Sequence, residues 1–184
     1  MKRAIREQLT QAIQRYLDRR QLKYKVDSDG DFHLLVGFAE VPIQARMLIL
    51  REGQQGEILS VVVRFEGGYT FSEEEAARKA NEWNVLRRWP RIYWRDGHFY
   101  GDFHLDCEAG ISQRLIELML HRVLLGSLQF ILYLKEHQAE KSRQADSRGV
   151  TVPSLSSDWG EELAEQAIAQ LFKMLGDKDP LIHH

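Results

Sequence analysis

Four side chains that can bind metal ions follow one another closely in the second half of the chain. They are His98, Asp102, His104 and Asp106. Carboxylates and imidazoles bind divalent metals, and a metal-bound water can act as the nucleophile of a hydrolase. Alternate residues of a strand share a face but lie ~7 Å apart, at ~3.3 Å rise per residue, so one ion needs further ligands from elsewhere. We therefore expect a hydrated strand face here, and metal-assisted hydrolysis is the weakest of three functional hypotheses.

The run Asp27-Ser28-Asp29-Gly30-Asp31 has the acidic composition of a calcium loop. An EF-hand loop that starts at Asp27 needs glycine at its sixth position and glutamate at its twelfth, where this chain has Phe32 and Phe38. Asp and Gly are also the residues preferred in tight turns. The pattern therefore indicates a turn and not a calcium site.

Cations alternate with aromatic side chains in the segment after residue 86. On a hairpin, four of them share the outer face: Arg91, Tyr93, Arg95 and Tyr100. Such a face suits single-stranded nucleic acid, but arginine and aromatic residues are also enriched in protein interfaces. The neighbouring Asp96 and Asp102 and the net charge of −2 disfavour nucleic acid. We expect a protein partner at this surface, with single-stranded nucleic acid as the alternative.

The composition limits the remaining possibilities. The 184 residues are 43% hydrophobic and 28% charged, which excludes a wholly disordered chain and a polytopic membrane protein. Cys107 is the only cysteine, so no intrachain disulfide is possible and a reducing cytoplasm is expected. The chain has no P-loop, Gly-x-Ser-x-Gly or His-Glu-x-x-His motif. We expect no catalytic residue, no cofactor and no metal, so the sequence does not indicate an enzyme.

Hydrophobic periodicity predicts the helices and strands that position the surface formed by Arg91, Tyr93, Arg95 and Tyr100. Apolar residues at three- and four-residue spacing predict a helix over 3–20. Alternation predicts two short strands joined by a three-residue loop with Gly30 in the left-handed position, which pairs Val26 with Phe32. Two longer strands follow, and Pro42 suits the beginning of the first.

In the second half of the chain, the residues at which helices and strands begin and end are easier to predict. Ser72 and Glu75 form a capping box that begins a second helix, which must end before Pro90. Asp96-Gly97 turns a hairpin that sets Trp94 opposite Phe99 and Arg91 opposite Asp102. Ser112 caps a third helix over about 113–136.

The elements together predict an α+β fold. The expected order is α-ββββ-α-ββ-α plus a C-terminal helix, with an antiparallel sheet of five to six strands and helices packed mainly on one face. We divide the chain into a domain over 1–136, a linker over 137–160 and an accessory helix over 161–176. The terminal His183-His184 receive no role.

The third predicted helix is apolar on more than one face, so it needs a second cover. Either the C-terminal helix or another subunit could contact it, at the residues Leu120, Leu124, Leu128 and Ile131. Glu117 and Arg122 interrupt its apolar stretch, so we do not expect it to span a membrane.

Several segments of the second half of the chain form a recognisable pattern: Asn81-Glu82-Trp83-Asn84, Arg88-Trp89-Pro90-Arg91-Ile92-Tyr93, Asp96-Gly97 and Gly110-Ile111-Ser112. Together they resemble the YbjN family of bacterial proteins, most strongly over residues 72–125. Family members are described as sensory-transduction regulators and are similar in fold to type III secretion chaperones, which are commonly dimeric and bind other proteins. The resemblance implies an α+β domain with helices against an antiparallel sheet.

The family pattern also implies a scaffold whose residues have physical roles. It comprises Asn81, Trp83, Asn84, Arg88, Trp89, Pro90, Asp96 and Gly97. The two tryptophans would anchor the second helix and the next strand to the sheet, and Pro90 would enforce the change from helix to strand. Both asparagines would bond to nearby backbone. We expect a non-enzymatic protein-binding module, chaperone-like or regulatory, with an unidentified partner. We also expect a homodimer through the third helix and the adjacent sheet edge.

Overall fold

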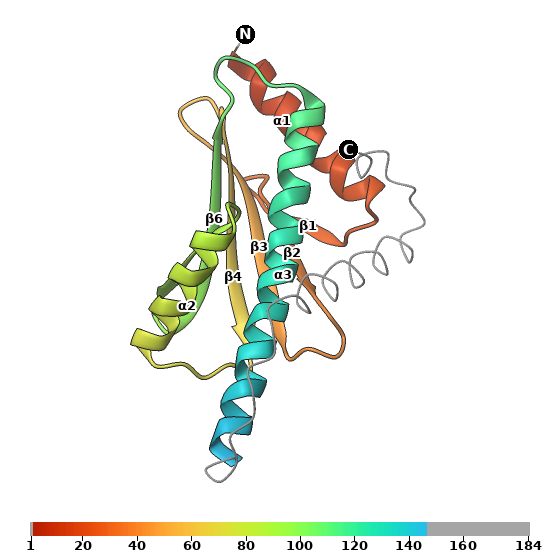
Figure 1. Ribbon diagram of the computed structural model, residues 1–184. Helices are drawn as coiled ribbons and strands as arrows, with labels where there is room; N and C mark the ends of the chain where they lie inside the picture. Colours follow the sequence, from red (N-terminus) through yellow and green to blue (C-terminus); the bar gives the residue numbers. More distant parts are fainter. Residues whose placement is uncertain (1, 147–184) are drawn as a thin grey trace, which may run out of the picture. The chain divides into compact units, whose positions relative to one another are not determined.

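The computed structural model describes residues 2–146, with side chains placed over 5–138 (Figure 1). The elements are α1 (Lys2–Arg19), β1 (Tyr24–Val26), β2 (Phe32–Gly37), β3 (Ile43–Glu52), β4 (Ile58–Gly67), α2 (Glu73–Leu86), β5 (Arg91–Arg95), β6 (His98–Asp106) and α3 (Gln113–Asp146). All six strands form one antiparallel sheet in the order β1-β2-β3-β4-β6-β5. The predicted α+β class and order of elements are confirmed.

Both hairpins have the register that was predicted from their turns. The paired residues are Val26 with Phe32, Trp94 with Phe99, and Arg91 with Asp102. Gly30 has φ +84°, the left-handed conformation that the first turn requires. Asp96 and Gly97 have φ +49° and +77°, the signs of a type I′ turn, whose twist matches that of the flanking strands.

One face of the sheet forms the core. Its central residues are at most 3% exposed: Ile43, Ala45, Met47, Ile49, Leu59, Val61, Val63 and Phe65. The helices cover this face (Figure 1), and Phe130 of α3 lies at the junction. Its ring centroid is 4.8 Å from that of Phe65 and 5.0 Å from that of Trp83 in α2. The arrangement explains why the apolar residues of the central strands alternate.

Polar contacts hold α1 against the N-terminal part of α3. Arg19 Nη2 donates to Glu117 Oε1 at 2.6 Å, and Tyr16 Oη lies 3.4 Å from His121 Nδ1. The predicted apolar stripe of α1 is buried beneath these contacts, with Leu9, Ala12, Ile13, Tyr16 and Leu17 at most 4% exposed. The arginines of α1 therefore border a docked helix, as amphipathic patterning predicts.

The predicted capping box of α2 is present. Glu75 N donates to Ser72 Oγ at 3.2 Å, and Ser72 N donates to Glu75 Oε2 at 2.9 Å. The buried stripe of the helix ends at Trp83, because Val85 and Leu86 are 77% and 70% exposed. The last two residues of the helix therefore do not pack against the rest of the described fold.

The third helix is longer than predicted. It continues past Glu136 to Asp146, through the first part of the segment predicted as a linker. That segment is rich in Gln, Glu, Lys, Arg and Ala, which are strong helix formers even without an apolar stripe. The sheet, α1, α2 and α3 as far as Gln138 lie in one compact unit, Met1–Gln138. The predicted helix over 161–176 lies outside the described residues.

The helix α3 is also notable for its length and its apolar composition. Residues Gln113–Gln138 are long and apolar enough to cross a membrane by length and composition alone. In the fold, 56% of the apolar part of this helix is buried inside the protein, as in the core helix of a compact domain.

Candidate functional site

The face of the sheet opposite the helices contains the predicted Arg/Tyr surface. We call it the open face. Its residues form rows across the strands, because even-numbered residues of β3, β4 and β6 pair with one another. From one end to the other, the rows are Gln44-Glu66 with His98-Arg95; Leu35-Arg46-Arg64-Tyr100-Tyr93; His33-Leu48-Val62-Asp102-Arg91; Leu50-Ser60-His104; and Glu52-Ile58-Asp106.

The four residues predicted as a partner surface lie together at one corner of this face. We call Arg91, Tyr93, Arg95 and Tyr100 the Arg/Tyr corner. Tyr93 and Tyr100 stack with ring centroids 5.7 Å apart and planes 13° apart, and Tyr93 is 37% exposed. Partial burial, together with the nearby Asp102 carboxylate, raises the pKa of Tyr93, so its hydroxyl stays protonated and can donate.

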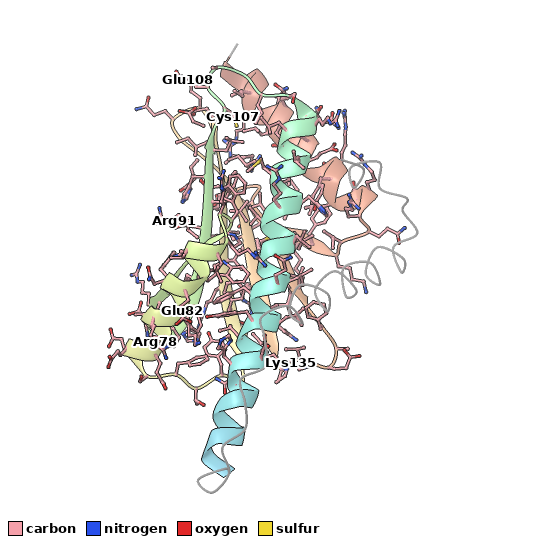
Figure 2. The ribbon with its side chains drawn as sticks, in the orientation of Figure 1. Arg78, Glu82, Arg91, Cys107, Glu108 and Lys135 are labelled. Carbon is pink, nitrogen blue, oxygen red and sulfur yellow. The ribbon has the colours of Figure 1, made fainter. Side chains whose placement is uncertain are left out.

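Both arginines of the corner are accessible. Arg91 is exposed and lies opposite Asp102 across the hairpin, and Figure 2 shows it pointing away from α3. Arg95 Nε donates to Asp96 Oδ2 at 3.0 Å, but the two side chains are 73% and 77% exposed. Exposed ion pairs of this kind contribute little to stability, so these cations remain available to a partner.

The surface extends beyond the corner onto β3 and β4. Arg46 donates from Nε and Nη2 to the two oxygens of Glu66, at 3.0 and 3.1 Å. This bidentate contact lowers the pKa of Glu66. Arg64 Nη2 lies 3.0 Å from His98 Nε2, while His98 Nδ1 lies 2.9 Å from Asp96 O. The arrangement fits a neutral imidazole that donates from Nδ1 and accepts at Nε2.

Sequence reasoning missed Arg46 and Arg64. Alternation along each strand places them on the outer face, but only the pairing Arg46–Arg64–Tyr100 shows that they join the corner in one row. Leu48 and Val62 pair in the next row, and Leu50 follows them, each half-buried. Along β3 the open face is thus aliphatic in the middle and charged at both ends, while Asp102 and Arg91 continue the row of Leu48 on β6 and β5.

A serine, a histidine and a glutamate also meet on this face. Ser60 Oγ lies 2.8 Å from His104 Nδ1, and Glu52 Oε2 lies 3.8 Å from the same nitrogen. A catalytic triad needs the acid and the nucleophile on opposite ring nitrogens. Ser60 is also fully buried, so a substrate cannot reach its hydroxyl. The contact is therefore a structural hydrogen bond.

The residues considered as metal ligands share one face of β6 but do not converge. In the described part of the chain, no three His, Cys, Asp or Glu side chains are grouped so that they could hold a metal ion. His98 and His104 are engaged by Arg64 and Ser60, and Asp106 Oδ1 accepts from Glu108 N at 2.8 Å. The geometry gives no support to metal-assisted hydrolysis.

The acidic run after β1 is a turn, as predicted. Asp27 Oδ1 accepts from the backbone N–H groups of Asp29 and Asp31 at 3.0 and 2.9 Å. Its other oxygen, Oδ2, lies 2.7 Å from His33 Nε2. The hydrogen bond from His33, followed by those from the backbone, lowers the pKa of Asp27.

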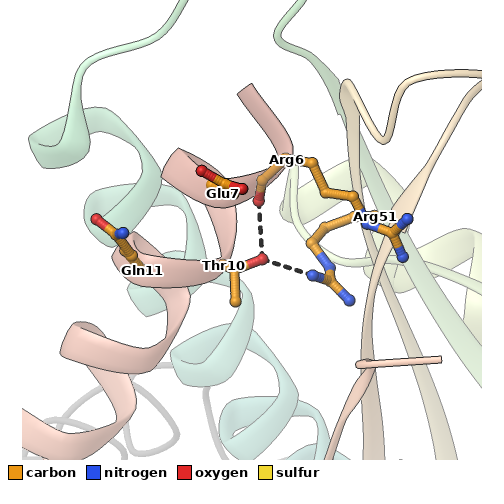
Figure 3. Close-up of a pocket in the computed structure, with 5 residues that line it drawn as sticks. All are labelled: Arg6, Glu7, Thr10, Gln11 and Arg51. Carbon is orange, nitrogen blue, oxygen red and sulfur yellow. Dashed lines mark hydrogen bonds between the residues drawn. The ribbon is translucent and has the colours of Figure 1, made fainter. Parts of the chain in front are cut away.

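A pocket of about 240 Å³ lies beside α1, lined by Arg6, Glu7, Thr10, Gln11 and Arg51 (Figure 3). The Arg51 side chain is only 5% exposed and donates to Thr10 Oγ1 and to Gly30 O. Arg6 Nη2 donates to Asp29 O at 3.2 Å. Both guanidinium groups therefore bind the β1–β2 turn, and the pocket is part of the contact between that turn and α1.

The family-motif residues around α2 hold the sheet edge. Asn84 Nδ2 donates to Ile92 O, and Ile92 N donates to Asn84 Oδ1, both at 2.8 Å. The side-chain amide thus bonds the outer edge of β5 as a neighbouring strand would. Trp83 Nε1 donates to Pro90 O at 3.4 Å. Asn81 is exposed and makes no such side-chain contact within the described residues, so backbone bonding was correct for Asn84 and wrong for Asn81.

The loop that contains Trp89 and Pro90 packs closely against α3. A Cβ atom at Gly126 would lie 2.3 Å from Trp89 O, and Arg122 Cζ lies 5.6 Å from the Trp89 ring centroid. Arg88, by contrast, is exposed. The motif residues Trp83, Asn84, Trp89 and Pro90 therefore join α2, β5 and α3 into one unit.

The residues considered for a dimer or C-helix contact lie on α3. Leu120, Leu124, Leu128 and Ile131 are 2%, 7%, 4% and 0% exposed. All four are buried within the chain, and Leu124 and Leu128 continue the helix side on which Glu117 and His121 contact α1. The accessible surface described above is on the other layer of the fold.

A six-stranded antiparallel sheet with helices on one face and an open opposite face defines a two-layer α+β protein. A sequence profile described as "YbjN: Putative bacterial sensory transduction regulator" matches residues 10–136, well over half of the chain. The chain belongs to the YbjN family, in agreement with the resemblance of its motifs. No match was found among curated proteins or among solved structures.

Proposed function

We propose that this YbjN-family protein is a non-enzymatic binding protein, regulatory or chaperone-like, that recognises another protein through the Arg/Tyr corner. The observation that carries the proposal is the stacked pair of Tyr93, which is exposed, and Tyr100, which is half-buried, flanked by the exposed Arg91 and Arg95. Tyrosine and arginine dominate binding energy in protein interfaces, because both offer large contact areas with polar ends. The family description supports the regulatory part of the proposal.

Two further observations favour binding over catalysis. The buried Ser60 cannot act as a nucleophile, and three of the four side chains considered as metal ligands, His98, His104 and Asp106, are engaged elsewhere. Cys107 is buried and free, and burial raises the pKa of its thiol, which suits a structural cysteine in a reducing cytoplasm. The cytoplasmic location is part of the proposal.

The proposal is tested by comparing two charge-reversal variants. Tagged protein captures partners from the source cells, and the strongest candidate is purified and titrated against each variant by calorimetry. We expect Arg91→Glu/Arg95→Glu to weaken binding at least about tenfold. The control Arg78→Glu/Arg114→Glu makes the same charge change on exposed helix positions and should bind normally. Equal binding by both variants would refute the role of the corner.

Single-stranded nucleic acid is the alternative ligand, because the stacked tyrosines could accept bases. The carboxylates of Glu66 and Asp102 on the same face oppose a phosphate backbone. We expect no change in the anisotropy of labelled oligonucleotides at low salt. Binding that weakens steeply with salt and is lost in Arg91→Glu/Arg95→Glu would assign the corner to nucleic acid instead.

A further inference from the structure

The net charge of the open face changes sign between its two ends: arginines outnumber Glu66 at one end, Asp102 pairs with Arg91 in the row of Leu48, and the other end is acidic. Arg46 and Arg64 lie in one row, whereas Glu52 and Asp106 lie in the row at the far end. Between these rows lie the half-buried aliphatic residues Leu48, Val62 and Leu50. A surface with this order is complementary to itself when one copy is turned end over end.

We propose that a second copy of this chain packs face to face on the open face, with strands antiparallel to their own counterparts. The inference rests on the proposed binding role of this face and names the partner for β3, β4 and β6, whereas the β5 residues of the Arg/Tyr corner remain for the protein ligand. The two-fold axis runs across the strands, between the row of Leu48 and the row of Leu50. Each strand then faces the same strand of the other copy.

The observed register specifies the contacts that this axis creates. The row of Leu48 faces the row of Leu50, so Leu48 meets the partner's Leu50 and Asp102 meets the partner's His104. The row of Arg46 faces the row of Glu52, so Arg46 meets the partner's Glu52 and Tyr100 meets the partner's Asp106. Two-fold symmetry makes every contact twice, as an isologous interface requires.

The physical gain comes from the middle of the face. Sheets that pack face to face lie ~10 Å apart and interdigitate their side chains, which removes the aliphatic rows from water. Arg46 keeps its bond to Glu66, while Glu52, which is 51% exposed, gains an opposite charge. The charged ends thereby select one orientation of the second copy.

The same geometry covers Tyr100 with the partner's Asp106 but leaves the three β5 residues of the corner, Arg91, Tyr93 and Arg95, uncovered. Strand β5 begins at Arg91 and reaches only the three rows at the basic end, so it has no residue in the two rows at the acidic end. The partner's β5 therefore covers neither Arg91 nor Tyr93. A dimer of this kind can bind its protein ligand at two corners.

The test uses a charge swap followed by sedimentation velocity at micromolar concentrations. The wild type should be a dimer. Arg46→Glu alone sets a glutamate opposite the partner's Glu52, and Glu52→Arg alone sets an arginine opposite the partner's Arg46. The dissociation constant of each variant dimer should therefore rise at least about tenfold. An equimolar mixture of the two variants should form a heterodimer, because both of its cross-contacts pair opposite charges.

Circular dichroism of each variant controls for folding, since Arg46 also binds Glu66 within the chain. The double variant Arg46→Glu/Glu52→Arg should regain the dimer by itself. A monomeric wild type overturns the inference, as does a dimer that neither substitution weakens or a mixture that fails to associate. The corner variant Arg91→Glu/Arg95→Glu should remain dimeric, so loss of partner binding and loss of the dimer are separate outcomes.

Discussion

Replacing Asn84 by alanine tests how the family motif holds the sheet edge. The substitution removes two hydrogen bonds to Ile92, each 2.8 Å long. At about 0.5–1.5 kcal/mol for each bond, the loss is about 1–3 kcal/mol. Alanine is the better helix former by up to about 0.7 kcal/mol, which offsets part of this loss. We therefore expect Asn84→Ala to lower the free energy of unfolding by about 0.3–2.3 kcal/mol.

The control is Asn81→Ala in the same helix. Asn81 is exposed and lacks such a bond within the described part of the chain, so only the helix-propensity gain remains, and stability should be unchanged or slightly higher. Urea denaturation measures the difference, which corresponds to roughly 1–9 °C in Tm for Asn84→Ala. Hydrogen exchange at the Ile92 amide should also accelerate in this variant alone. Equal stability of the two variants would refute the claim that Asn84 stabilises the outer edge of β5 through its bonds to Ile92.

Three other substitutions or measurements test parts of the fold. Gly126→Ala gains about 1 kcal/mol of helix propensity, but the new Cβ atom would overlap Trp89 O, and such overpacking costs about 1–3 kcal/mol. The variant should therefore be less stable than the wild type in urea. A stabilised variant would contradict the close packing of Gly126 against Trp89. The pKa of Asp27 is lowered by His33, so its charged form stabilises the fold above about pH 4 and the benefit is lost as pH falls through the folded value. The stability advantage of the wild type over Asp27→Asn should therefore shrink in acid denaturation series, and a constant advantage would exclude this linkage. Burial raises the pKa of Cys107, so iodoacetamide should label its thiol slowly in native protein and rapidly in urea, whereas rapid native labelling would show an accessible thiol.

The sequence predicts local structure well where a turn and an alternating pattern agree. Asp96-Gly97 determines the register of its hairpin because only a short primed turn suits that pair, and both predicted cross-strand pairs are present. The Arg/Tyr corner follows directly from this register. The one-sided burial of β3 and β4 follows from their period-two apolar residues.

The rest depends on contacts between distant segments. Alternation shows which residues of a strand share a face, but it does not show that β6, and not β5, pairs with β4. For this reason Arg46 and Arg64 could not be assigned to the same surface as Tyr100 from the sequence. The part-buried Ser60–His104 contact and the close approach of Gly126 to Trp89 are likewise products of tertiary packing.

The central claim is that a protein binds at the Arg/Tyr corner, and site-specific photocrosslinking in the source cells tests it most directly. Tyr93 is replaced by a photoreactive phenylalanine, which preserves the aromatic ring at a position that is 37% exposed. Arg114, exposed at the beginning of α3, carries the same group as the control. We predict a discrete protein adduct at position 93 that is absent at position 114 and disappears when Arg91 and Arg95 are reversed to glutamate. The same adduct at both positions, or only a nucleic-acid adduct at position 93, would contradict the account.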